Sequence, residues 1–266
     1  MNKIRTQFTI LFILFNIFVS LPKPVGAKTY AMVICGICRD KQYETIKTKM
    51  IIDLQSYLLN KTEVTSDTIK VLTPDGTGNN SSQFTNIKKV MSDFESVIKP
   101  EDKFIFFYTG QANVVNQQLR LNLPDEDITQ VQLGELLKNI KASSNLIVLD
   151  CPASGLAVKE LSAKDRIIIC SCTDEQRFTI KFSEYFVPAL NNTESDIDED
   201  GKISILEAFI AASKNVQDWY RTKNLILTET PVLDDNGDGK ASKEPWRYII
   251  DMKDGLTASK FFLEKE

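Results

Sequence analysis

Apolar residues along the chain occur in two patterns, short continuous runs and longer stretches with helical spacing. Continuous runs are typical of strands buried on both faces of a sheet, and apolar residues every three or four positions indicate amphipathic helices. The runs predict strands over residues 29–35, 68–72, 103–108, 145–150 and 166–170. The helical spacing predicts helices over residues 43–59, 86–97, 129–140, 178–190 and 203–220, and residues 117–123 predict a small extended excursion.

The order of these elements predicts the fold class. Buried strands that alternate with helices favour a mainly parallel sheet with right-handed crossovers, and therefore an α/β fold, a three-layer α/β/α sandwich. In such sheets, functional residues gather at the carboxyl ends of the strands. Four of these ends lie at Cys35, Gly110, Asp150 and Cys170. The sequence has no internal repeat or long linker, so we expect a single domain over residues 28–266.

Residues 1–27 have the pattern of an export signal. Lys3 and Arg5 precede an apolar run over residues 8–21, and small residues up to Ala27 form a cleavage site. The run is short for a membrane span, which needs about 20 residues. We therefore expect cleavage after Ala27, a secreted or periplasmic protein, and no membrane span once the signal is removed.

The chain has no histidine among its 266 residues. This excludes Ser–His and Cys–His catalysis and His-ligated metals within the chain. Removal of the export signal would leave 29 basic and 36 acidic residues, a net charge of −7. An acidic exported chain is a poor binder of nucleic acid, so we expect no nucleic-acid partner.

Four segments follow one another in a recognisable order: FTNIKKVM at residues 84–91, DKFIFFYTGQ at 102–111, IVLDCPASG at 147–155 and RIIICSCTDEQ at 166–176. Together they resemble the caspase–legumain fold, and most closely the legumain-like cysteine peptidases and their bacterial relatives. The resemblance covers residues 29–250. It implies a caspase-like sandwich, with a catalytic His after one strand and a catalytic Cys after the next.

The chain departs from that family at both catalytic positions. Gln111 stands where the resemblance places the general base, and Pro152 stands where it places the nucleophile. A Gln amide cannot take up a proton at working pH, and proline has neither a nucleophile nor a backbone N–H for an oxyanion. We therefore expect a catalytically inactive homologue that acts as a binding or scaffold protein. A peptide would lie in the degenerate cleft, with Gly110, Asp150 and Ser154 at its floor.

Two alternative interpretations assign a chemical activity to the chain. Cys151 lies one residue before Pro152 and could be a relocated nucleophile, although a shift of one residue in a strand turns a side chain to the opposite face. Ser154 is more typical of a helix N-cap than of a nucleophile. The second alternative is a thiol–disulfide protein, because Cys35 and Cys38 have the CxxC spacing of disulfide exchangers. A zinc site built from the cysteines is weaker, since paired CxxC motifs are missing.

The most specific local motif is DIDEDGKISILE, over residues 196–207. It matches the twelve-residue calcium loop, in which oxygen ligands occupy positions 1, 3, 5, 7, 9 and 12 and a glycine at position 6 allows the turn. The predicted ligands are Asp196, Asp198, Asp200, the carbonyl of Lys202, Ser204 and Glu207. We therefore expect calcium as a cofactor, holding the following helix to the body of the protein.

A second acidic loop covers residues 234–245. Asp234, Asn236 and Asp238 fit positions 1, 3 and 5 of the calcium pattern. Position 12 is Pro245, and Glu244 lies one place early, so the bidentate acid is missing. The resemblance to bacterial legumain-like proteins, which often carry both loops, favours calcium here as well.

Overall fold

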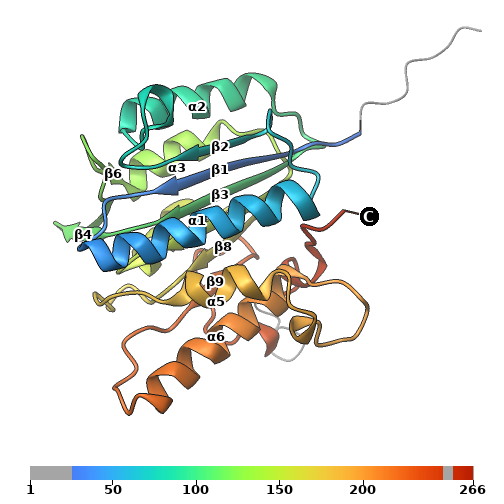
Figure 1. The fold of residues 1–266 in the computed structure, drawn as a ribbon. Coiled ribbons are helices and arrows are strands. Elements are labelled where there is room, and N and C mark those ends of the chain that lie inside the picture. The colour runs from blue at the N-terminus through green and yellow to red at the C-terminus, as the bar shows by residue number, and fades with distance from the viewer. Residues whose placement is uncertain (1–25, 248–253, 266) are drawn as a thin grey trace, which may run out of the picture.

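A six-stranded sheet lies between two layers of helices (Figure 1). The computed structural model describes residues 26–247 and 254–265, so the predicted export signal lies almost wholly outside the described residues. The strand order is β2-β1-β3-β7-β8-β9. These strands are β1 Thr29–Cys35, β2 Ile69–Leu72, β3 Lys103–Thr109, β7 Ser144–Asp150, β8 Arg166–Cys170 and β9 Val232–Asp234. All are parallel except β9, which pairs antiparallel with β8.

Five of the helices were predicted, with ends that differ from the observed ones by a few residues, and the short helix over Val158–Leu161 was not predicted. The helices are α1 Lys41–Lys61, α2 Phe84–Val97, α3 Gln130–Lys138, α4 Val158–Leu161, α5 Phe182–Ala189 and α6 Ile205–Thr222. Thr129 caps α3 with a full capping box, in which its hydroxyl accepts from the N–H of Gln132 at 3.2 Å. This side-chain bond fixes where the helix begins.

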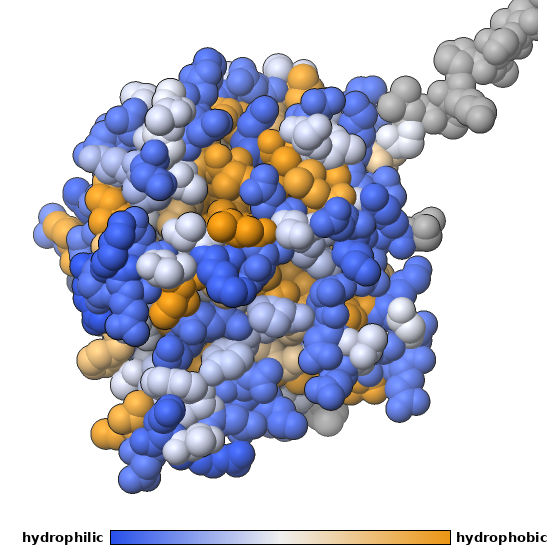
Figure 2. Space-filling view, viewed as in Figure 1, coloured by the Kyte–Doolittle hydropathy of each residue, from blue (hydrophilic) through white to orange (hydrophobic). Residues whose placement is uncertain are grey.

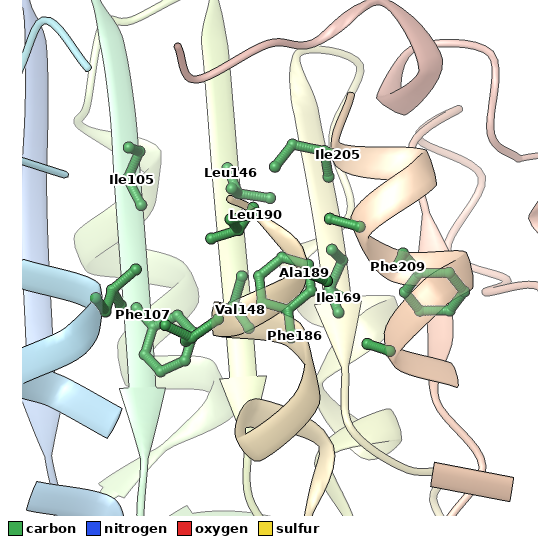
Figure 3. Packing of buried hydrophobic residues seen from close by; sticks show 14 of the residues in the cluster. Ile105, Phe107, Leu146, Val148, Ile169, Phe186, Ala189, Leu190, Ile205 and Phe209 are labelled. Carbon is green, nitrogen blue, oxygen red and sulfur yellow. The ribbon is translucent and has the colours of Figure 1, made fainter. Parts of the chain in front are cut away.

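Two hydrophobic cores form because alternate residues of each strand face opposite sides of the sheet. On one face, Ile105 and Phe107 of β3 and Val148 of β7 pack against α1, α5 and α6. Figure 3 shows these strand residues beside Phe186 of α5 and Phe209 of α6. On the other face, alternate residues of the same strands pack against α2, α3 and α4. The sheet is therefore buried on both sides, as its apolar runs predicted.

A small antiparallel sheet lies outside the main one. It contains β4 Ala112–Val115, β5 Gln118–Leu121 and β6 Ile128–Thr129. The sequence predicted extended structure only over residues 117–123, because β4 has no apolar run of its own. Strand β9 was also missed, since it is three residues long and finds its place only by pairing with β8.

The face seen in Figure 2 is mostly hydrophilic, with apolar side chains exposed in smaller groups. Within the described residues, no helix has the length and apolar character required to cross a bilayer.

Candidate functional site

Three parallel strands end side by side at the carboxyl edge of the sheet. Cys35, Thr109 and Asp150 occupy matching positions in β1, β3 and β7. The Asp150 carboxylate is fully buried and accepts a hydrogen bond from the Thr109 hydroxyl at 2.6 Å. The edge that the resemblance identified as catalytic is thus centred on an acid that is closed off from solvent.

Lys47 of α1 neutralises this acid. Its ammonium lies 2.6 Å from Asp150 Oδ2, and both side chains have no exposed surface. The same ammonium donates to the Ser183 hydroxyl at 2.9 Å, and the Ser183 N–H donates to Asp150 Oδ1 at 3.2 Å. Burial lowers the pKa of Lys47, but the charge of Asp150, its hydrogen bond and the nearby Tyr43 and Glu184 together outweigh burial. The net pKa is therefore raised, and the ammonium stays charged.

Sequence reasoning did not single out Lys47, although a signal was present. The lysine interrupts the apolar side of α1, where the neighbouring buried residues include Tyr43 and Met50. A lysine in the middle of a buried stripe is rarely tolerated without a partner. That position therefore required an acid from elsewhere in the fold, and Asp150 lies 103 residues away in the chain.

The two degenerate positions lie next to this pair. Gln111 is held by its backbone, whose N–H donates to the Ile37 carbonyl at 2.8 Å and whose carbonyl accepts from the Tyr108 hydroxyl at 2.7 Å. Pro152 is buried in the turn after β7. Ala153 follows it with φ +60°, a left-handed conformation that is uncommon for a residue with a side chain. Its N–H donates to the Gln176 carbonyl at 2.7 Å, which holds the turn in this shape.

Cys151 faces the other side of the sheet from Asp150. It has no exposed surface and packs in the core that α2, α3 and α4 cover. Burial is the main reason that the pKa of its thiol is raised well above the ordinary value. Successive side chains along the strand face opposite sides of the sheet, so the Cys151 thiol points away from Asp150, as the sequence suggested. The thiol is neither accessible nor activated in this structure.

Two expectations about this edge differ from the structure. Gly110, Asp150 and Ser154 are all buried, so they do not form the floor of an open cleft. The physical reason for Asp150 is its pairing with Lys47. Ser154 is not a helix N-cap either, because Ala153 takes that position without a side-chain bond. The Ser154 hydroxyl instead accepts from the N–H of Cys172 at 3.2 Å.

Cys35 and Cys38 form a thiol pair at the end of β1. Cys35 is buried and Cys38 is partly exposed. The interaction between the two thiols is the largest cause of a lowered pKa at Cys38 and a raised pKa at Cys35. The positive charge of Lys47 lowers both values. This asymmetry, with a partly exposed thiol of lowered pKa beside a buried partner, is typical of disulfide exchangers.

Glu229 is a second buried acid that sequence reasoning missed. It has no exposed surface, and its carboxylate accepts from the backbone N–H groups of Lys181 and Phe182 at 2.7–2.9 Å. The pKa of Glu229 is raised to about 8, mainly by burial and then by the charge of Asp150, while these hydrogen bonds partly oppose the rise. No local pattern marks this residue, because its environment is built by α5 from elsewhere in the chain.

The first acidic loop brings together three of its predicted ligands. Carboxylate oxygens of Asp196, Asp198 and Glu207 lie within 4.8 Å of one another. Asp200 is not in this group, and its Oδ1 accepts from the Lys202 N–H at 2.8 Å. Glu207 is buried, and its oxygens already accept hydrogen bonds from backbone N–H groups. Ser204 serves as the N-cap of α6, with its hydroxyl donating to Glu207 Oε2 at 2.8 Å.

The second acidic loop gains a residue that the sequence pattern did not include. Asp234, Asp238 and Asp254 place carboxylate oxygens within 4.8 Å of one another. Asn236 belongs to the loop as predicted, and its Oδ1 accepts from the Asp238 N–H at 2.8 Å. Asp254 is almost fully buried, and burial raises its pKa to about 6.

Both loops lie at the opposite edge of the sheet from Asp150. Ser204 bridges to Phe262, whose carbonyl accepts from Lys103 at the start of β3. Gly239 donates to the Ser162 hydroxyl at 3.0 Å, just before the start of β8. Ions bound at these loops would therefore stabilise the fold and would not lie near Cys151.

A comparison of the backbone with solved structures decides the fold. Caspase-1 from Spodoptera frugiperda superposes with a TM-score of 0.51 at 9% identity, over 79% of this chain and 87% of that chain. The chain has a caspase-like fold. No family model and no curated protein matches the sequence.

Proposed function

We propose that this chain is an exported protein with a caspase-like fold that lacks peptidase activity, binds calcium at residues 196–207, and acts as a binding or scaffold protein. The observation that carries the proposal is the chemistry at the carboxyl ends of β3 and β7. Gln111 and Pro152 supply neither a general base nor a nucleophile. The adjacent acid, Asp150, is already paired with Lys47.

The burial of the Cys151 thiol is evidence against the alternative of an active peptidase. A thiolate is the reactive form of cysteine, and burial disfavours it here more than the charge of Lys47 favours it. Substrate would also need to reach a side chain that has no exposed surface. The peptidase alternative would therefore require the turn around Pro152 to rebuild.

Apolar side chains in two loops at the sheet's carboxyl side support a binding role. Phe178 is 60% exposed in the loop before α5, and Ile226 is 86% exposed in the loop after α6. The two loops are joined through Gln176, whose side chain bonds with Thr230 at 2.8 and 3.1 Å. Apolar side chains presented on anchored loops suit a peptide or protein partner with an apolar segment.

The three-carboxylate cluster of the first loop supports calcium. Three acids in one loop repel one another unless a cation neutralises them, and oxygen ligands of this kind suit calcium. We expect the Glu207→Gln variant to lose calcium binding at this loop. The amide keeps the capping bonds to Ser204 but cannot act as a bidentate carboxylate.

Alkylation of native cysteines tests the proposed lack of activity. The mature chain, residues 28–266, is reduced and calcium-loaded, treated with iodoacetamide between pH 6 and 8, and analysed by mass spectrometry. Cys38 is the internal reference because it is partly exposed. We expect Cys151 to react about 100-fold more slowly than Cys38, because its labelling requires local opening. In guanidinium chloride the two rates should converge.

A Cys151 that reacts as fast as Cys38 at pH 6 would overturn the proposal. The same result accompanied by peptide turnover, lost in Cys151→Ser, would establish the peptidase instead. Partner binding is tested separately by selecting peptides from a random phage library on the immobilised chain. The double variant Phe178→Ser/Ile226→Ser is the control, and peptides that bind it equally well would argue against these loops.

A second candidate function is disulfide exchange, because Cys35 and Cys38 have the CxxC spacing and each thiol shifts the pKa of the other. The Cys38 thiolate would attack a substrate disulfide, form a mixed disulfide and release one thiolate. Cys35 would then lose its proton, displace the second thiolate and close a Cys35–Cys38 disulfide, so that the substrate is reduced to two thiols. Glutathione redox buffers and acid-trapped alkylation test this step. The Cys35→Ser variant should accumulate a glutathione mixed disulfide at Cys38, and its absence would refute exchange.

A further inference from the structure

Two buried carboxylate oxygens in the cluster of Asp234, Asp238 and Asp254 have no hydrogen-bond partner among the described residues. They are Oδ2 of Asp234 and Oδ2 of Asp254. Both side chains are about 1% exposed, and their carboxylates lie in the cluster that Asp238 completes. A buried carboxylate oxygen without a partner costs free energy, because it has lost its water and gained nothing in exchange. Two such oxygens in one cluster indicate a missing positive ligand.

Asp254 supplies a carboxylate that the second loop lacks at position 12. In the twelve-residue pattern, the closing acid would lie at Pro245, which has no carboxylate. Asp254 comes 20 residues after Asp234 and returns to the cluster from the C-terminal segment. Asp235 holds that return in place, since its two carboxylate oxygens accept from the N–H groups of Gly255 at 2.8 Å and Ala258 at 2.7 Å.

The backbone of the second loop matches that of the first, position by position. Positions 4 and 6 have left-handed φ in both, at Glu199 (+58°) and Gly201 (+85°) in the first loop and at Gly237 (+78°) and Gly239 (+75°) in the second. The carboxylate at position 5 accepts from the N–H at position 7 at 2.8 Å in each loop. The second loop is therefore wound like the first, although its closing acid comes from outside.

We propose that Asp234, Asn236, Asp238 and Asp254 form a second calcium site, in which Asp254 takes the place of the absent position-12 acid. Three carboxylates and one amide are hard oxygen ligands, and the carbonyl of Lys240 at position 7 would add a fifth. The two unpartnered oxygens become ligands. This site is independent of the proposed function, which invokes calcium only at residues 196–207.

The site would tie the C-terminal segment to the sheet. Asp254 belongs to the C-terminal segment, residues 254–265. In this segment the N–H of Lys265 donates to the Lys61 carbonyl at 3.0 Å, and the carbonyl of Phe262 accepts from the Lys103 ammonium. A cation held jointly by Asp234 and Asp254 would join β9 to this segment. Calcium removal would then weaken the attachment of the C-terminal residues to α1 and β3.

Calorimetric titration of the mature chain with calcium chloride, after chelator treatment and desalting, tests the site. We expect two sites in the unaltered chain and one in Asp254→Asn, which retains an acceptor oxygen for the Asp235 N–H. Affinity at the second loop should fall at least 100-fold. Glu244→Gln is the matched control, because Glu244 is the acid closest to position 12 in the sequence and should have no effect.

The variants can refute the two proposed calcium sites separately. If Glu207→Gln abolishes all binding and Asp254→Asn changes nothing, the second site is refuted and the first stands. If Asp254→Asn abolishes all binding, the second site stands and the first fails. Loss of a site in Glu244→Gln, with Asp254→Asn unchanged, would also overturn the role of Asp254.

A measurement on the unaltered chain guards against a variant that fails to fold. Asn236-Gly237 is the only Asn-Gly pair in the chain, so ¹³C-asparagine and ¹⁵N-glycine labelling isolates one amide signal. This signal should shift and saturate as calcium is added. A Gly237 amide that does not move at millimolar calcium would refute the site whatever the variants show.

Discussion

The buried pair of Lys47 and Asp150 offers the sharpest test of how this edge is built. Removing one member of a buried ion pair leaves the other charge uncompensated, which costs about 3–5 kcal/mol. Asp150→Asn removes the negative charge and leaves the Lys47 ammonium with neutral acceptors alone, among them the Ser183 hydroxyl at 2.9 Å and the Ile180 carbonyl at 3.4 Å. Lys47→Met leaves the carboxylate with the Thr109 hydroxyl and the Ser183 N–H. We expect each single variant to lose about 3–5 kcal/mol of unfolding free energy.

The double variant Lys47→Met/Asp150→Asn removes both charges. Because no unpaired charge then remains in the core, its cost should fall short of the sum of the single costs by about 2–3 kcal/mol. A typical domain has only about 5–15 kcal/mol of stability, so each single variant should be conspicuously weakened.

Urea unfolding followed by circular dichroism, at fixed pH and calcium, measures these differences. The exposed pair of Arg221 and Asp218 is the control, because its separation of 2.8 Å is similar but its side chains are 80% and 40% exposed. Asp218→Asn should cost less than about 1 kcal/mol. Additive losses in the cycle, or single losses below about 1 kcal/mol, would show that the pair does not hold this edge together.

Further outcomes follow from other sites. The pKa of Glu229 is raised to about 8, mainly by burial, above its ordinary value of 4.5, so the folded state holds this proton more tightly than the unfolded state. The free energy of unfolding should therefore fall by on the order of 5 kcal/mol between pH 4.5 and 8. Glu229→Gln should flatten that pH dependence in urea unfolding. Thr129→Ala should cost about 1 kcal/mol by the same assay, since it removes the capping box of α3. Gly36→Ala should cost several times more, because a Cβ there would lie 2.1 Å from the Tyr108 hydroxyl, and soluble, fully stable protein would contradict this packing. Chelation should lower the thermal midpoint, since a ligand at 100 times its Kd adds about 2.7 kcal/mol, and an unchanged midpoint would exclude calcium as a stabilising ion.

Much of the fold could be predicted because its strands are buried on both faces. Such strands need unbroken apolar runs, and the run of β8, Arg166–Cys170, was predicted with its observed bounds. The helix predicted to begin at residue 129 likewise matches α3, whose N-cap is Thr129, because capping is a contact between residues three apart. Ser154 shows the limit of this reasoning. Its hydroxyl has a local opportunity to cap, but a partner from the loop after β8 occupies it instead.

The sequence alone determined the chemistry that this chain lacks and the elements that its apolar periodicity encodes. The absence of histidine and the presence of Gln111 and Pro152 are facts of composition that no fold alters. Only the tertiary structure decided which charges meet. Lys47 with Asp150 and Asp234 with Asp254 are pairs whose members come from separate elements. The physical reason is that local spacing governs helices, strands and caps, whereas a buried charge is satisfied by whichever residue the packed chain brings within a few ångströms.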